Sequence, residues 1–81
     1  MTYSILIEKI IDGSLPEGYY YAHVPALDLT THGQGIEGAR EAALDLITLW
    51  IAEKRENSED VPLESESYFS RVEIVDAVQS A

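Results

Sequence analysis

Four segments of the chain have the residue types and the alternation of hydrophobic and polar positions that are typical of β-strands. The first three are Tyr3–Ile11, Tyr19–Val24 and Leu27–Thr31, and the fourth is Tyr68–Val78. β-branched and aromatic residues dominate the first two segments, and such residues fit a pleated surface well. Because successive side chains of a strand point to opposite faces, this alternation predicts four strands.

A fifth segment has the period of an α-helix. From Ile36 to Ile51 the apolar residues recur mostly at intervals of three and four, which places them along one stripe. Lys54 and Arg55 follow the stripe, and cations at this end suit the helix dipole. Gly35 is the expected N-cap, although it caps a helix less well than Ser, Thr or Asp. The predicted stripe consists of Ile36, Ala39, Ala43, Leu46, Ile47, Trp50 and Ile51.

The segments between these elements are polar and contain residues that favour turns. The sequence DGSLPEG at residues 12–18 predicts a turn that joins the first two strands into a hairpin. Residues 56–67 are polar, contain Pro62 and are expected to form a solvated loop. The order strand, strand, strand, helix, strand predicts an α+β fold of two layers: one long helix on a three-stranded antiparallel sheet, with a fourth strand after the helix. The length of 81 residues predicts a single α/β domain spanning residues 1–81.

The charge of the chain excludes one class of partner and favours another. Fifteen acidic and five basic side chains give a formal net charge of −10. A protein that binds nucleic acid directly needs Lys and Arg to displace counterions from phosphates, and five scattered basic residues form no such patch. A chain this acidic is instead steered toward a basic protein.

Other features of the composition predict a cytoplasmic protein. The most apolar stretch, residues 42–52, contains Asp45 and is about half as long as a membrane span. The first residues lack the basic leader of a signal peptide, so secretion is not expected. The chain has no cysteine, which excludes a disulfide framework, a Cys-ligated zinc site and a thiol nucleophile.

We expect no catalytic centre, metal site or cofactor, and therefore no enzymatic activity. Gly33, Gly35 and Gly38 have G-x-G-x-x-G spacing before the helix, but that fingerprint also needs a βαβ unit. A tight turn in which glycine permits positive φ is the favoured interpretation, and a nucleotide or metal in this turn is the alternative. His23 and His32 lack the spacing of metal ligands, so both are expected to be structural or exposed. His32 is also a candidate for a pH-sensitive contact.

The run of three tyrosines predicts an interaction surface. In a strand, Tyr19 and Tyr21 share one face and Tyr20 lies on the other, so one helix cannot cover all three. Exposed tyrosines are typical of protein interfaces, and the thin core of so short a chain also favours a homo-oligomer, either a dimer or a tetramer. Acidic residues along the helix either form a solvated face or contact a basic partner. The candidate partner-binding residues are Tyr19, Tyr21, Asp28, His32, Glu37 and Glu41.

Most of the sequence, roughly residues 3–63, resembles the N-terminal domain of HicB-type antitoxins. The shared features are an aromatic strand of the form Y-x-A-x-x-P-x-L, a glycine turn, a helix with small and then large residues on one face, and a proline after the helix. Glu64 replaces the second proline of the family motif, and Gly35 stands where the family usually has a capping Thr. The matching residues are Tyr20, Ala22, Pro25, Leu27, Gly33, Ala39, Ala43, Leu46 and Pro62.

The resemblance implies a fold, a partner and a mechanism. It implies a partial ribonuclease H fold with the element order given above, which does not by itself imply nuclease activity. It also implies an antitoxin of a toxin–antitoxin system, which binds and masks a small basic HicA-type toxin that cleaves messenger RNA. Many HicB proteins continue into a DNA-binding domain, which this chain is expected to lack. The alternative is a stand-alone oligomeric interaction module of the same fold, with another partner and no enzymatic activity.

Overall fold

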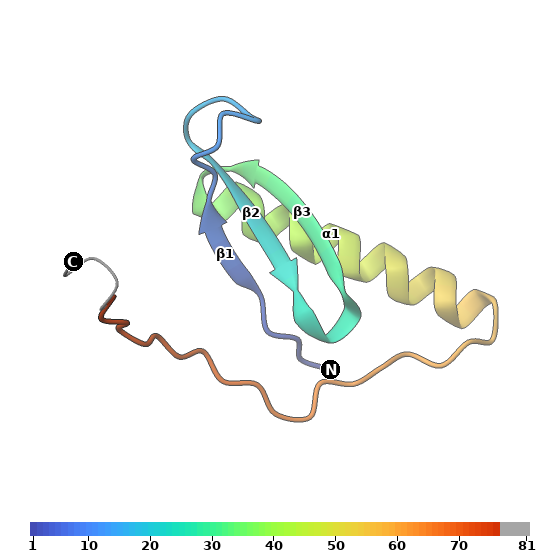
Figure 1. The fold of residues 1–81 in the computed structure, drawn as a ribbon. Helices are drawn as coiled ribbons and strands as arrows, with labels where there is room; N and C mark the ends of the chain where they lie inside the picture. Colours follow the sequence, from blue (N-terminus) through green and yellow to red (C-terminus); the bar gives the residue numbers. More distant parts are fainter. Residues whose placement is uncertain (77–81) are drawn as a thin grey trace.

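The computed structural model describes residues 1–76 as a three-stranded sheet with one long helix on one of its faces (Figure 1). The strands are β1 (Leu6–Lys9), β2 (Tyr19–Val24) and β3 (Leu29–Gln34), and the helix is α1 (Gly35–Glu56). The sheet order is β1-β2-β3, and both pairs of neighbours are antiparallel. The architecture is therefore α+β in two layers, as the sequence predicts.

The register of the sheet determines which side chains face the helix. Ala22 of β2 lies opposite Ile7 of β1 on one side and Thr31 of β3 on the other. Ala22 is fully buried, so these three positions share the face toward α1. Because β2 is paired along both edges, β1 and β3 each keep one edge without a strand partner among the described residues.

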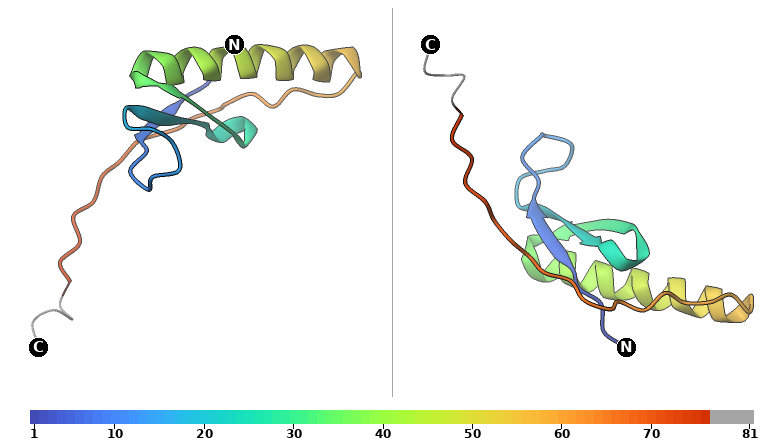
Figure 2. Two further views of the ribbon diagram at one scale, coloured as in Figure 1. Left: turned by 90° about the horizontal axis from the view of Figure 1, so that it is seen from above. Right: turned by 60° about the horizontal axis from the view of Figure 1, so that its bottom comes forward.

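The core lies between β2, β3 and α1, and small residues let the two layers approach closely. A Cβ atom built on Gly33 would lie 2.4 Å from the backbone carbon of Gly38, so strand and helix meet there backbone to backbone. Figure 2 shows α1 as a separate layer over the sheet, and α1 contacts β1 least. The buried cluster consists of Ala22, Val24, Leu27, Ala39, Ala43 and Ile47.

Several predicted elements are confirmed, some with changed ends. β2 has the predicted bounds, whereas β1 is shorter than the predicted Tyr3–Ile11. Gln34 is the N-cap of α1 instead of Gly35, and it makes no side-chain cap hydrogen bond, so the helix start is weakly capped as expected. Ile36, the first residue of the predicted apolar stripe, lies exposed in the first turn. The polar segment after the helix contains neither helix nor strand, in agreement with the predicted loop.

The third strand begins two residues later and ends three residues later than predicted. Pro25–Leu27 form a 3-10 turn, because the fixed φ of proline suits the first position of such a turn. Asp28 then adopts a left-handed conformation with φ 53, which Asp tolerates better than most residues. The chain reverses at this point, so Leu27 belongs to the turn, and β3 starts only at Leu29.

The predicted fourth strand, Tyr68–Val78, is not present in the part of the chain that the structure describes. Residues 57–76 have no strand or helix, and Ala77 and Val78 lie outside the described residues. The segment passes the N-terminal residues and then leaves the body of the molecule (Figures 1 and 2). The radius of gyration is consequently 16.4 Å, whereas a compact domain of this length would have about 12 Å. The alternating residues from Tyr68 to Val75 are therefore not hydrogen-bonded to a neighbouring strand.

Candidate functional site

The face of the sheet that points away from α1, here called the outer face, carries the most distinctive group of side chains. Tyr20, Ala22 and Val24 of β2 point toward the helix, and the alternate residues Tyr19, Tyr21 and His23 point the other way. The outer residues of β3 are Thr30, His32 and Gln34, and all three are exposed. The outer face thus combines two tyrosines with the two histidines of the chain.

The imidazole of His23, near the end of the central strand β2, contacts both neighbouring strands. His23 Nε2 lies 2.6 Å from Glu8 Oε1 of β1, and His23 Nδ1 lies 3.0 Å from Thr30 Oγ1 of β3. His23 Nε2 is shielded from solvent, but its direction toward Glu8 is not that of a well-aligned hydrogen bond. The contact between His23 and Glu8 is therefore mainly electrostatic and is strongest when the ring is protonated.

The turn between β1 and β2 extends this polar group. The Ser14 backbone N–H donates to Asp12 Oδ1 at 2.9 Å, and Ser14 Oγ lies 3.3 Å from the Tyr21 hydroxyl. The hydrogen bonds from the side chain and backbone of Ser14 lower the pKa of the exposed Asp12 carboxyl. Asp12 therefore remains ionised to a lower pH than an ordinary aspartate.

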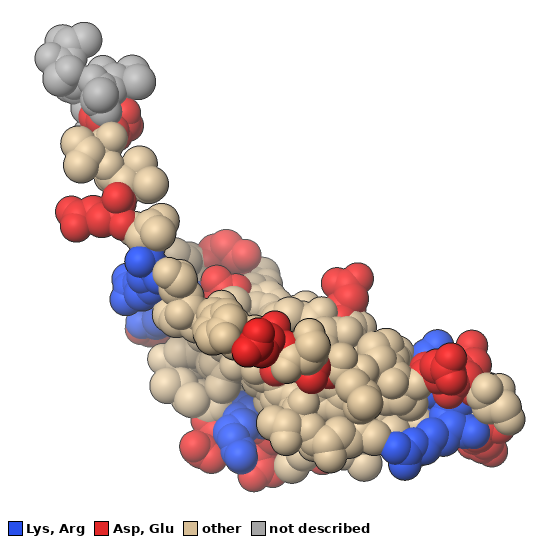
Figure 3. All heavy atoms as spheres, turned by 90° about the horizontal axis from the view of Figure 1, so that it is seen from below, with Lys and Arg blue, Asp and Glu red and all other residues tan. Residues whose placement is uncertain are grey.

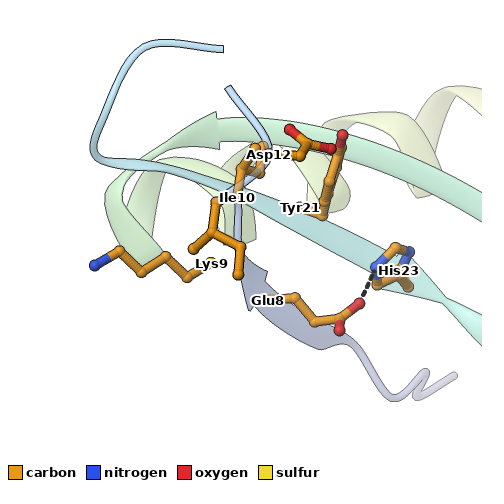
Figure 4. A pocket seen from close by; sticks show the side chains of 7 residues that line it. Glu8, Lys9, Ile10, Asp12, Tyr21 and His23 are labelled. Atoms are coloured by element: carbon orange, nitrogen blue, oxygen red, sulfur yellow. Dashed lines mark ion pairs between the residues drawn. The ribbon is translucent and has the colours of Figure 1, made fainter. Parts of the chain in front are cut away.

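A shallow concavity of about 260 Å³ lies where the turn meets the outer face (Figure 4). Its polar side includes the ion-paired Glu8 and His23, and its apolar side includes the buried Ile10. The full lining is Glu8, Lys9, Ile10, Ile11, Asp12, Tyr21 and His23.

Aromatic contacts order the remainder of the outer face. The Tyr19 and His32 ring centroids are 6.3 Å apart, and the Tyr21 and His23 centroids are 5.8 Å apart, with tilted planes in both pairs. Rings held against one another lose less side-chain entropy when a partner binds. Tyrosine is also enriched at protein interfaces, since it offers a large apolar area and one hydroxyl group.

The structure brings together only half of the residues that the sequence nominated for partner binding. Tyr19, Tyr21 and His32 lie together on the outer face. Asp28 lies at the turn before β3, and Glu37 and Glu41 lie on the solvent side of α1, in the other layer. The set therefore forms two surfaces, an aromatic surface on the sheet and an acidic surface on the helix.

Glu8 and its contact with His23 were missed by the sequence interpretation. Both residues occupy alternate positions of predicted strands, so their presence on one sheet face could have been inferred. Their pairing depends on the hairpin register, which the turn sets with two left-handed glycines, Gly13 and Gly18. The expectation that His23 is structural fits its contacts with two strands.

The residues of the resemblance have mainly packing roles. Ala22 and Ala39 are fully buried, Leu27 is nearly so, and Tyr20 packs against the same cluster. Pro25 opens the 3-10 turn, and Pro62 accepts a hydrogen bond through its carbonyl from the Tyr3 hydroxyl at 2.5 Å. Each of these residues therefore contributes to the fold, and none lines the concavity.

The glycine turn before the helix is explained by backbone geometry. Gly35 has a φ of 72, which confirms the predicted need for positive φ, and Gly33 is required by the close approach of α1. Within residues 1–76 no group of three or more histidines, aspartates and glutamates is arranged to hold a metal ion. The same residues contain no helix that is both long and apolar enough to cross a membrane.

The outer face therefore offers a partner aromatic rings, hydroxyl groups and two imidazoles, of which His23 is partly exposed and His32 is exposed. No protein-family model matches the chain, and comparisons with curated proteins and with solved structures also give no match.

Proposed function

We propose that this chain is a non-enzymatic protein-binding domain whose outer face contacts a basic partner. The observation that supports this proposal most strongly is the ordered outer face, where two tyrosines and two histidines form two ring pairs. The helix does not cover this face, so the rings are available to a partner. The net charge of −10 adds a long-range attraction for a basic protein, which raises the association rate.

The partner we propose is a small basic RNase of the HicA type, because the sequence resembles the N-terminal domain of HicB antitoxins. Tyr19, Tyr21 and His32 would form the contact, and Glu37 and Glu41 would contribute to the field that attracts the toxin. Inhibition would follow from covering the RNA-binding surface of the toxin, with no chemistry by this chain. This role also implies a cytoplasmic location.

The finer fold is part of the same proposal. The partial ribonuclease H fold has a strand after its helix, and here the chain after α1 follows β1 in the same direction (Figure 2). Ser4 bonds Glu64 through its backbone N–H at 2.8 Å and its hydroxyl at 2.6 Å, and residues 67–69 face residues 4–6 across a gap. This placement supports a strand that forms beside the free edge of β1.

The alternative is a stand-alone oligomeric module of the same fold. It is favoured by the apolar side chains exposed after Ser67, which a partner of some kind would cover. The two proposals differ in whether a basic RNase is needed for the biological role.

The deciding experiment is co-expression with the small reading frame beside its gene, followed by affinity purification and native mass measurement. A 1:1 or higher-order complex that relieves toxicity is the expected result. Tyr19→Ala combined with Tyr21→Ala should weaken the complex at least about tenfold, because interface tyrosines are frequent hot spots. Tyr68→Ala is the matched control, since Tyr68 is exposed but lies outside the outer face.

Two results would overturn the antitoxin proposal. One is a neighbouring protein that is neither toxic nor bound. The other is a complex that the double tyrosine variant and the Tyr68 control weaken equally. The association rate should also fall as salt increases, because the attraction is long-range.

A further inference from the structure

The last described residues, 70–76, form an extended segment that we call the arm. Val72, Ile74 and Val75 of the arm are 78%, 79% and 86% exposed. Apolar side chains gathered in one short segment at this exposure are typical of a surface that a partner covers. Val72 and Ile74 alternate with the charged Arg71 and Glu73, as in the strand predicted from the sequence.

The chain's own sheet is too short to accept the whole arm. Residues 67–69 face residues 4–6 across a gap, and β1 ends at Lys9. The free edge therefore has room for only the first residues of the arm, to about Val72, and Glu73–Asp76 lie beyond it. Both views of Figure 2 show the chain continuing past the sheet at this point.

The same molecule has a largely apolar groove beside the start of β1, whereas the arm lies beyond the end of β1. Residues 1–5 and α1 enclose a hollow of about 360 Å³, which stays open because α1 lies mainly over β2 and β3. Figure 3 shows a broad surface without charges on the side of the molecule that holds the N-terminus, with charged side chains toward its ends. The groove is lined by Met1, Thr2, Tyr3, Ile5, Arg40, Leu44, Ile47, Thr48 and Ile51.

The arm and the groove are complementary in charge as well as in apolarity. Arg40 is the one cationic side chain among the groove residues, and Glu73 lies between Val72 and Ile74 in the arm. The arm cannot easily reach the groove of its own chain, because the two lie at opposite ends of β1. A reversal would need a tight turn, and residues 65–75 contain neither Gly nor Pro.

We propose that the arm of one copy occupies the groove of a second copy, and that the exchange is reciprocal. A twofold dimer results, since each copy both donates an arm and offers a groove. Arm side chains Val72 and Ile74 contact Leu44 and Ile51 of the second copy, and Glu73 lies on the opposite side of the arm, at the rim of the groove. The outer face stays free in this dimer, so the proposal is independent of the one made for the basic partner.

Mass measurement at about 100 μM, by light scattering and native mass spectrometry, tests the dimer. The unchanged chain should be dimeric, and a chain that ends at Phe69 should be monomeric. Leu44→Lys should raise the dimer dissociation constant at least about tenfold, because it places a charge in the groove. Leu49→Lys is the matched control, since Leu49 is on the same helix and 70% exposed but does not line the groove.

The absence of native cysteines allows a direct test of exchange. A chain with Leu44→Cys is mixed with a chain carrying Ile74→Cys, and mild oxidation should give a covalent dimer that contains one of each. A single chain that carries both Leu44→Cys and Ile74→Cys would form an internal disulfide if the arm folded onto the groove of its own chain. Circular dichroism of each variant distinguishes loss of the dimer from loss of the fold.

Three results would overturn the proposal. The first is an unchanged chain that remains monomeric at this concentration. The second is a dimer that persists after removal of the arm, which would place the interface elsewhere. The third is a disulfide that forms within the double variant but not between the mixed chains. Binding of a basic partner by the shortened chain would leave the proposed function intact in all three cases.

Discussion

The strand β2 and the arm contain similar alternating residues but adopt different states. Val24 in β2 is fully buried, whereas Val72 in the arm is largely exposed. β2 has a hydrogen-bonded strand on each side and a helix over one face, while residues 70–76 have no neighbouring strand. The comparison shows that alternation defines which residues can form a strand, and that an available edge and a cover decide whether they do.

The largest expected effect comes from disrupting the close contact between β3 and α1, the helix that packs on β2 and β3. Gly33→Ala places a Cβ about where the backbone of Gly38 now lies, and backbone atoms cannot move aside cheaply. We expect a loss of about 3 kcal/mol in the free energy of unfolding, measured by urea titration. Gly13→Ala is the control, because it has positive φ but open space, and should cost about 1 kcal/mol. Equal losses would show that the close approach of Gly33 to Gly38 is not decisive.

A second test makes the same substitution in both regions. Val24→Ala removes two buried methyl groups from the core and should cost about 2 kcal/mol in the free energy of unfolding. Val72→Ala should cost less than about 0.5 kcal/mol at concentrations where the chain is monomeric. At concentrations where the proposed dimer forms, Val72→Ala should lower the apparent stability further, and a lack of concentration dependence would contradict the arm's role.

A smaller effect is expected at the ion pair on the outer face. Glu8→Gln should lower the free energy of unfolding by about 0.5–1 kcal/mol at low salt and by less at high salt, because salt screens a partly exposed ion pair. The control is Glu59→Gln, whose partner Lys54 is 3.4 Å away at the more exposed helix end. A loss at Glu8 that is the same at both salt concentrations would mean that the contact with His23 is not electrostatic.

The smallest expected effect concerns the hydrogen bonds between Ser4 and Glu64, which hold the segment before the arm beside the N-terminal residues. Hydrogen bonds from the Ser4 side chain and backbone lower the pKa of the Glu64 carboxyl below its ordinary value of 4.5. The folded-state pKa is the lower one, so the contact is fully present above 4.5 and is lost as pH falls through the folded value.

Fluorescent labels on Thr2→Cys and Ser70→Cys would report this loss as a longer and broader distance at low pH. Glu64→Gln should give nearly the same distance at every pH in this range. A transition that persists in Glu64→Gln would assign the effect to another carboxyl group, such as Asp12.

The differences between prediction and structure have specific physical causes. The bounds of β2 and the length of α1 follow from local residue types, because each has a clear period and clear ends. The displacement of β3 depends on the left-handed conformation of Asp28, which no periodic pattern reveals. Residues 68–76 form no strand although their sequence alternates, because a strand also needs hydrogen bonds to a neighbouring strand, which a local pattern does not reveal.

The candidate site was predictable to the same extent. Alternation alone was enough to place Tyr19 and Tyr21 on one face, and His32 joined them once β3 extended to Gln34. The Glu8–His23 contact required the register of the hairpin, and that register is set by the conformation of residues 12–18. Alternation within a strand therefore placed the tyrosines, whereas the Glu8–His23 contact, which depends on the register between strands, was missed.

The meeting of Gly33 and Gly38 also has a mechanical consequence. Backbone atoms cannot change rotamer, so the contact between Gly33 and Gly38 holds the start of α1 at a fixed distance from β3. The later turns of α1 contact the core through side chains such as Trp50, which can adjust. The helix extends about 27 Å beyond Gly38, and a rotation of about 5° there would displace its last turn by about 2 Å. Such a tilt would widen or narrow the space between the helix and residues 1–5 while the sheet kept its shape. A tilt of this kind would therefore change the groove beside residues 1–5 and leave the outer face unaltered.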